Sequence, residues 1–260
     1  MVRIVDVEPD DLVLDVGCGL GYSSAVLARM VKTIQDVVDE SGAKLGNVRA
    51  VGIGAPGPLN PKTGMILHAP NLGPTWNELP IAAHLSERLG CPVYLGNDVN
   101  MGAVGEHVLG AGKGYKHLVA IFVGTGIGGG LILNDELYRG VRYTAGELGH
   151  VVLMAGGPLC GCGKHGCAEA LASRTAMERE VRARIAAGQA SIVPGLLEEM
   201  GRETMSSSII EAALDAGDEV VHEVLAQAEY YMGLLVANVV NTLDPEVVVL
   251  GGGVVERLRT

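Results

Sequence analysis

The sequence predicts an α/β protein with two lobes, on three observations. Its 260 residues can bury a large core, and 48% of them are apolar, which excludes a disordered chain. Glycine is abundant, with 38 residues concentrated at the ends of predicted strands. That pattern is typical of α/β proteins whose loops approach phosphates or sugars. Finally, the glycines of residues 110–114 precede a new strand and mark the expected hinge between the lobes.

Charge excludes several partners. The net charge of −11 argues against a duplex nucleic acid or an anionic membrane surface as the partner. Arg3, Asp6 and Glu8 interrupt the N-terminus, so no signal peptide is expected there. No apolar run reaches transmembrane length. The cytoplasm is therefore the expected compartment.

Residues 12–22 predict a strand, a glycine turn and the start of a helix. This stretch resembles the first nucleotide-binding motif of S-adenosylmethionine-dependent methyltransferases. The helix that follows has one apolar face and ends at Gly42. Its apolar positions are Leu27, Met30, Val31, Ile34, Val37 and Val38. The next strand, residues 49–53, ends without the acid that would hold a ribose. A methyltransferase is thus a minor alternative. The other interpretation of this stretch is a strand–turn–helix unit whose only role is packing.

The next elements offer two candidate ligand positions. A strand within residues 50–59 runs into a turn at Gly57, which is either a rigid turn or a close backbone approach to a ligand. Asn77 is the expected N-cap of a helix over residues 78–89, which Gly90 ends. A strand at residues 93–97 then opens onto a helix. Asp98, beside Asn97, is either a helix cap or a carboxylate at a ligand-binding strand end.

A strand at residues 117–123 leads into the glycine-rich residues 124–130. A loop here can wrap backbone N–H groups around phosphate oxygens, with Gly124, Gly126 and Gly128 giving access and Thr125 adding a hydroxyl. No Gly-Lys-Ser/Thr follows, so it is not a Walker loop. The alternative is a glycine-rich hairpin. A turn is expected at residues 134–140.

Residues 146–169 hold the strongest chemical signal. His150, Cys160, Cys162 and Cys167 offer three thiolates and one imidazole within eighteen positions, which matches a closed tetrahedral zinc site. The glycines at 161, 163 and 166 let the loop turn back on itself. Two carboxylates, Glu147 and Glu169, bracket the cluster and suit a polyhydroxylated ligand. Unrelated core and surface residues, or a disulfide, are the alternatives.

The remaining chain predicts mostly helix. One helix is expected over residues 168–187, followed by a loop over 191–203 with room for a short helix, and then helices over 208–216 and 219–243. A strand at residues 246–250 ends in a turn at Gly251 and Gly252.

Six motifs carry a resemblance over residues 31–253. They are Gly-Ile-Gly-Ala-Pro-Gly-Pro, Gly-Asn-Asp-Val-Asn, Val-Gly-Thr-Gly-Ile-Gly-Gly-Gly, Gly-Glu-Leu-Gly-His, Cys-Gly-Cys-Gly-Lys-His-Gly-Cys-Ala-Glu and Leu-Gly-Gly-Gly-Val. In this order they resemble the ROK family of sugar kinases and its bacterial glucokinase-like members. The resemblance implies a two-lobed, actin-like ATPase fold of the ribonuclease H-like kind, here truncated at both ends. The expected divisions are an atypical segment at 1–30, a small lobe at 31–113 and a large lobe at 114–260.

The resemblance also implies roles for single residues. Asp98 would be the catalytic base, and Asn97, Glu147, His150 and Glu169 would bind the sugar. The His150 and cysteine cluster would hold structural zinc, and ATP would arrive with Mg²⁺. Residues 124–130 would contact the ATP phosphates, and Gly251 and Gly252 would lie near the adenosine. We also expect a homo-oligomer.

The family's Asp-x-Gly-Gly-Thr phosphate motif is missing from this sequence, and Asp15 only echoes its start. A sugar-binding protein with little or no turnover is therefore the main alternative to an active kinase. A ROK repressor is a further alternative, but no helix-turn-helix pattern precedes Val31.

Overall fold

The computed structural model describes residues 23–67 and 76–258, and the predicted strand and turn at 12–22 lie outside them. The described chain forms two compact units. One comprises the described residues up to Met101 together with Gly140–Thr144, and the other comprises Gly102–Arg139 and the described residues from Ala145 onward. The lobe boundary expected at residue 113 stays a prediction.

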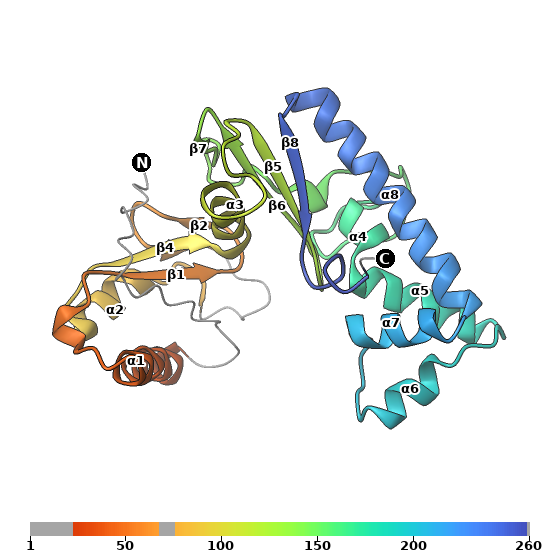
Figure 1. Cartoon of the computed structure of the whole chain (residues 1–260), viewed down its shortest axis with the longest axis horizontal. Helices are drawn as coiled ribbons and strands as arrows, with labels where there is room; N and C mark the ends of the chain where they lie inside the picture. The colour runs from red at the N-terminus through yellow and green to blue at the C-terminus, as the bar shows by residue number, and fades with distance from the viewer. Residues whose placement is uncertain (1–22, 68–75, 259–260) are drawn as a thin grey trace. The chain divides into compact units, whose positions relative to one another are not determined.

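The first unit contains a parallel pair of strands with two helices on the same side (Figure 1). A small antiparallel hairpin, β2–β3, follows the first strand. The elements of this unit are α1 (Ser23–Glu40), the 3-10 turn Leu45–Asn47, β1 (Val51–Ala55), β2 (Leu59–Asn60), β3 (Met65–Ile66), α2 (Ile81–Leu89) and β4 (Val93–Asn97). β1 and β4 run parallel, with Ala55 opposite Asn97, so both strands end at one edge.

The core of the first unit uses the apolar face predicted for α1. Leu27, Met30, Ile34 and Val38 are all buried, at the spacing of one helix face. They pack with side chains of β1, β4 and α2 in one cluster. Gly42 follows with φ of +75°, as the predicted helix stop requires. The predicted cap of α2 is wrong: the helix starts later, after Pro80, and no side chain caps it.

The second unit is built on a four-stranded sheet in the order β7-β6-β5-β8. β5, β6 and β7 are antiparallel neighbours, whereas β8 returns through the helices to lie parallel to β5. Its strands are β5 (Leu118–Val123), β6 (Ile127–Leu133), β7 (Glu136–Leu137) and β8 (Val247–Gly251). Its helices are α4 (Ala168–Ala172), α5 (Arg174–Ala186), α6 (Val193–Glu199), α7 (Ser207–Asp215) and α8 (Glu219–Leu243), with a 3-10 turn at Leu148–His150. Helix α3 (Asp98–Val108) continues directly from β4.

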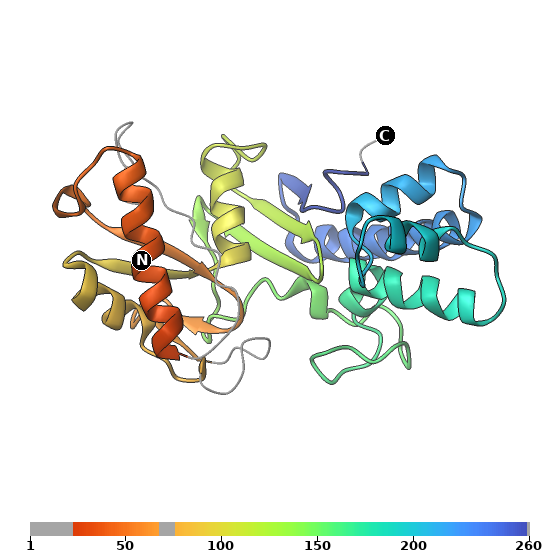
Figure 2. The ribbon, with the colours of Figure 1, turned by 90° about the horizontal axis from the view of Figure 1, so that it is seen from below.

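Both faces of this sheet are covered, and β5 shows how. Val119 and Ile121 belong to the large core formed with α4 to α8, whereas Leu118 and Ala120 pack with Ala103 of α3. This period-two alternation is what a strand buried on both sides requires. Figures 1 and 2 show α8 running along α4 and α5, and α3 on the other side of the sheet.

Two sequence expectations about this unit are corrected. The helix predicted over residues 168–187 is broken into α4 and α5 at Ser173, whose hydroxyl accepts a hydrogen bond from the Ala176 N–H and starts a new helix. The glycine-rich residues 124–130 form a hairpin: residues 124–126 make the turn, and Gly128 lies inside β6. The predicted bounds of α8 are those observed.

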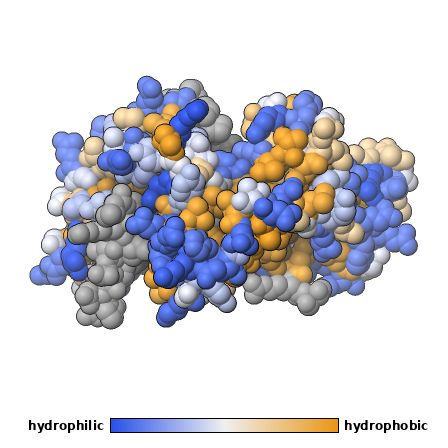
Figure 3. All heavy atoms as spheres, turned by 90° about the horizontal axis from the view of Figure 1, so that it is seen from above, coloured by the Kyte–Doolittle hydropathy of each residue, from blue (hydrophilic) through white to orange (hydrophobic). Residues whose placement is uncertain are grey.

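Strand β8 is the last strand of the sheet in the part of the chain that the structure describes, and it pairs with β5 alone. Leu250, in β8, keeps 39% of its surface exposed, and Val240, in α8, keeps 40%. Figure 3 shows hydrophobic side chains, in orange, gathered at one surface region among hydrophilic ones. None of the described helices is both long and apolar enough to cross a membrane.

Candidate active site and metal cluster

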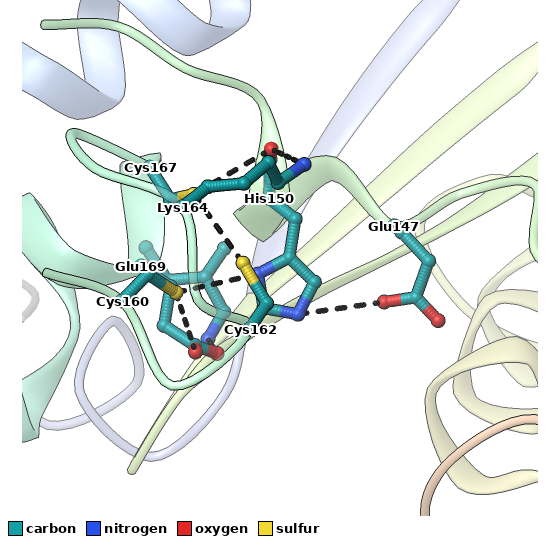
Figure 4. A network of polar contacts seen from close by, with 8 residues as sticks. Glu147, His150, Cys160, Cys162, Lys164, Cys167 and Glu169 are labelled. Carbon is teal, nitrogen blue, oxygen red and sulfur yellow. Dashed lines mark hydrogen bonds and ion pairs between the residues drawn. The ribbon is translucent and has the colours of Figure 1, made fainter. Parts of the chain in front are cut away.

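The four soft ligands predicted from the sequence converge in the second unit. The donor atoms of His150, Cys160, Cys162 and Cys167 all lie within 4.8 Å of one another. His150 Nδ1 is 3.6 Å from Cys160 Sγ, and Cys162 Sγ is 3.7 Å from Cys167 Sγ. A tetrahedral zinc ion with Zn–S bonds of about 2.3 Å would separate its sulfurs by about 3.8 Å. Two of the six edges of the cluster therefore already have the length expected for a tetrahedral site (Figure 4).

Backbone geometry brings the cysteines together. Gly163 and Gly166 adopt φ of +85° and +75°, and a Cβ on Gly166 would lie 1.7 Å from the Met154 carbonyl oxygen. Glycine is required at both positions. Gly161 has neither a positive φ nor a close neighbour, so its predicted part in the turn is not needed. Cys167 ends the loop as the residue before α4, and the Ala168 N–H bonds the Val151 carbonyl.

The thiols differ in acidity. Burial raises the pKa of Cys160 to about 12, and burial also raises that of Cys167. Burial acts in the same direction on Cys162, but the backbone N–H of Lys164 and the neighbouring thiols outweigh it and lower its pKa. All three cysteines are free thiols. Three thiolates at this spacing need a cation between them, so the donor set fits a divalent soft metal.

The second ring nitrogen of His150 faces away from the sulfurs. Its Nε2 lies 4.0 Å from Glu147 Oε2, while the His150 carbonyl accepts a hydrogen bond of 2.9 Å from Lys164 Nζ. Figure 4 shows Glu147 approaching the ring from the side opposite the cysteines. Half of the Glu147 side chain is exposed. The ring thus offers one nitrogen to the cluster and one, with Glu147, to an external hydroxyl.

Glu169 lies between the cluster and the glycine hairpin. Its Oε2 accepts a hydrogen bond of 3.0 Å from the Ile127 backbone N–H, and its Oε1 lies 3.8 Å from Cys160 Sγ. A Cβ on Gly126 would lie 2.4 Å from Glu169 Oε2, so this glycine makes room for the carboxylate. The sequence placed Glu169 near the cluster but did not indicate its contact with Ile127, which is 42 positions away.

The hairpin turn is also held from its other side. Arg174 Nη2 donates a hydrogen bond of 2.6 Å to Thr125 Oγ1, and the Arg174 N–H bonds the Gly124 carbonyl. Thr175 Oγ1 donates to the Thr125 carbonyl. Sequence reasoning missed both residues. The Ser-Arg-Thr triplet at 173–175 is a usable N-cap signal for α5, but nothing in it indicates a partner 49 positions away.

Two glycine turns share one edge of the sheet. β5 and β8 are parallel neighbours, with Phe122 opposite Gly251, and a glycine turn follows each of them. Gly252 has φ of +92°, and a Cβ there would lie 2.5 Å from the Val123 carbonyl oxygen. Parallel α/β sheets bind ligands at the carboxyl ends of their strands. Residues 124–126 and 251–253 therefore lie at the sheet edge where strands of this kind present their ligand-binding turns.

In the first unit, the structure brings Gly57, Asn97 and Asp98 to one sheet edge, since they follow the parallel strands β1 and β4. Asn97 Oδ1 accepts the Asn100 N–H at 3.0 Å and so caps α3. Asp98 Oδ1 accepts a hydrogen bond from the N–H of its neighbour Val99, and the residue is exposed. Gly57 has φ of +84°, so its turn requires glycine whether or not a ligand approaches it.

Comparisons with known proteins agree with this arrangement. The sequence model of the ROK family matches residues 23–259, and that of the protein-L-isoaspartate(D-aspartate) O-methyltransferase family matches residues 1–44, half of which lie outside the described chain. The chain is 38% identical to a glucokinase of Halalkalibacterium halodurans over 205 residues, which are 78% of this chain and 61% of that enzyme. It is 30% identical to a putative xylose repressor of Caldicellulosiruptor sp. over 230 residues, 87% of this chain and 55% of the repressor.

A solved structure gives the same result. The ROK family glucokinase of Streptomyces griseus, in complex with glucose and AMPPNP, aligns with a TM-score of 0.74 and 34% identity, covering 88% of this chain and 73% of that one. The fold is therefore the actin-like ATPase fold of sugar kinases. The chain belongs to the ROK family, and it resembles the glucokinases within it. It spans about three fifths of the length of the Halalkalibacterium enzyme.

Proposed function

We propose that this protein phosphorylates a hexose with ATP in the cytoplasm, and that the reaction is glucose to glucose 6-phosphate. The observation that carries the proposal is that two neighbouring side chains at the end of β4 have different roles. Asn97 caps α3, which leaves the exposed Asp98 carboxylate available as a general base. The relatives named glucokinase, and the one crystallised with glucose and AMPPNP, support the choice of substrates.

In this mechanism Asp98 accepts the proton of the attacking sugar hydroxyl as the bond to the terminal phosphate forms. Glu147 and His150 Nε2 would form hydrogen bonds with other sugar hydroxyls. The Asn97 oxygen caps α3, and the Asn97 amide N–H₂ would donate to a further hydroxyl. The turn at 124–126 presents backbone N–H groups and Thr125 Oγ1 to the phosphates. The turn at 251–253 lies on the adenosine side.

Two metals complete the proposal. His150, Cys160, Cys162 and Cys167 would hold zinc, and the ion would supply structural cross-linking, since four protein ligands would complete its coordination. Mg²⁺ would accompany ATP and would supply charge neutralisation at the phosphates. This chain's own contribution is to hold the sugar against Asp98 and to orient the phosphates along the glycine turns.

A coupled assay of ADP release tests the proposal, using a panel of hexoses with matched binding measurements by calorimetry. We expect glucose both to bind and to stimulate ADP release. Binding without turnover would instead support a sugar-binding protein, which the missing Asp-x-Gly-Gly-Thr motif and the similarity to a xylose repressor favour as the second candidate. Failure of every hexose to bind would contradict both.

The match of residues 1–44 to a methyltransferase family supports a separate test. We expect no stoichiometric binding of S-adenosylmethionine in calorimetry, because the sequence lacks an acid directly after β1, which ends at Ala55. Specific binding would revive the methyltransferase interpretation.

A further inference from the structure

The contacts of Glu169 join two parts of the second unit that the sugar-kinase mechanism treats separately. Its carboxylate belongs to α4, two residues after the metal-cluster residue Cys167. Its Oε2 bonds the Ile127 N–H at 3.0 Å, immediately after the 124–126 turn. Gly126 has no side chain to occupy the space that the carboxylate fills. The carboxylate is thus built into the base of the turn.

The metal loop, residues 160–167, carries the three cysteines of the cluster. It fixes the direction from which Glu169 reaches the turn. Cys167 is fully buried, pairs with Val152 in a β-bridge, and lies 3.7 Å from Cys162 Sγ. An ion bound by these sulfurs would lock Cys167 and hence the first turn of α4. A helix transmits that constraint to a side chain two residues further on.

The turn has a second anchor that does not depend on the metal loop. Arg174 bonds Thr125 Oγ1 and the Met205 carbonyl from the start of α5. Ser173 separates α5 from α4. The turn is therefore held at Thr125 by α5 and at Ile127 by the metal loop, and the two anchors can be removed separately.

We propose that Glu169 is a positioning residue that couples the metal cluster to the turn at 124–126, so that metal binding orders this turn for nucleotide phosphates. The proposal rests on the proposed nucleotide site. A carboxylate has about four lone-pair positions, so the bond to Ile127 leaves Glu169 free to accept a sugar hydroxyl as well. Coupling between two sites is reciprocal, so nucleotide should also tighten the metal.

The test compares AMPPNP affinity, by calorimetry, in zinc-loaded and zinc-depleted protein. We expect zinc to tighten AMPPNP at least about fivefold in the parent chain, the lower end of typical coupling between sites. Glu169→Ala should bind zinc with unchanged stoichiometry and lose the coupling. Glu169→Gln should keep most of it, because the amide oxygen still accepts the Ile127 N–H. Arg174→Ala should weaken AMPPNP equally in both zinc states and keep the ratio.

Backbone hydrogen exchange at Ile127 gives an independent readout. In zinc-loaded protein this amide should exchange at least about tenfold more slowly in the parent chain than in Glu169→Ala, and Glu169→Gln should restore protection. This comparison needs neither nucleotide binding nor a folded zinc-free protein. Failure of AMPPNP to bind would therefore count against the proposed kinase, while equal Ile127 exchange in the parent chain and Glu169→Ala would overturn the coupling role. A Glu169→Ala protein with the parent's zinc-dependent AMPPNP ratio would overturn it too.

Discussion

Asn97 and Asp98 are neighbours whose side chains have different tasks. The Asn97 oxygen satisfies the Asn100 N–H at the start of α3, a job that Asp98 would otherwise be expected to perform. From the sequence alone, capping and catalysis were equally good interpretations of Asp98. The hydrogen bonds favour catalysis, because the cap is already supplied.

We expect Asp98→Asn to lower the turnover of glucose by about 10²–10⁴-fold, the usual contribution of a general base. Hexose binding should change much less, because the amide still forms hydrogen bonds. The measurement is steady-state kinetics beside calorimetry. Asp36→Asn is the control, since Asp36 is an exposed acid that pairs with Lys32 on the surface of α1. Parent-like turnover in Asp98→Asn would mean that another group takes the proton.

At the scale of elements, the loop over residues 160–167 carries three of the four residues of the proposed zinc site. We expect one zinc per chain in protein purified without added metal, by elemental analysis. Cys160→Ser should lose zinc and lower both thermal stability and hexose affinity, because the same loop carries His150 and leads to Glu169. Cys91→Ser is the matched control, since Cys91 is also a buried free thiol but lies in the core of the first unit. A folded, sugar-binding protein without metal would contradict the zinc proposal.

The start of α8 depends on one buried carboxylate. Asp218 is 7% exposed and accepts hydrogen bonds from the Val221 and Ile192 N–H groups and from the Ser191 hydroxyl. Burial raises its pKa, but these hydrogen bonds outweigh burial and hold the pKa below its ordinary value of 3.8. The ionised carboxylate therefore stabilises the folded protein above about pH 4.

We expect Asp218→Ala to lower the free energy of unfolding by about 2 kcal/mol at pH 7, since it removes a helix cap and two further hydrogen bonds to a charged group. The difference from the parent should shrink as the pH falls from 4 through the lowered folded pKa, because the carboxyl protonates. Urea unfolding at a series of pH values measures it. Asp215→Ala, at an exposed acid on α7, should show neither effect. A difference that does not vary with pH would assign the loss to packing.

At the scale of the whole molecule, β8 is one of the two edge strands of the four-stranded sheet in the part of the chain that the structure describes. An unpaired strand edge with exposed apolar side chains promotes pairing with another chain. We expect the protein to self-associate, and Leu250→Lys to shift it toward monomer in analytical ultracentrifugation. Val141→Lys is the control, since Val141 is 96% exposed but lies outside every strand. An unchanged oligomer in Leu250→Lys would place the contact elsewhere.

Much of the fold was predictable from short-range patterns in the sequence. The buried face of α1, the bounds of α8 and the turn glycines depend on residues three or four positions apart, or on one backbone angle. The metal cluster was predictable for a similar reason, because its four ligands lie within one short segment. The family and its fold followed from ordered motifs.

The failures came from contacts that sequence spacing does not encode. The break at Ser173 replaced one long helix by two, because its hydroxyl caps α5 at a point where helix propensity alone would continue. Gly128 was predicted to lie in a phosphate loop but belongs to β6, because β5 pairs with β6 across the glycines. Propensity and glycine content could not distinguish these outcomes.

By itself, the sequence determined the class of fold and the family, and it identified the His150 and cysteine cluster and the candidate base, since each depends on residue type and local order. Only the tertiary structure decided how these parts are connected. Ile127 and Glu169 are 42 positions apart, and Thr125 and Arg174 are 49 apart. Each pair meets because the sheet and helices of the second unit pack into one core, which is a property of the folded chain and not of any segment.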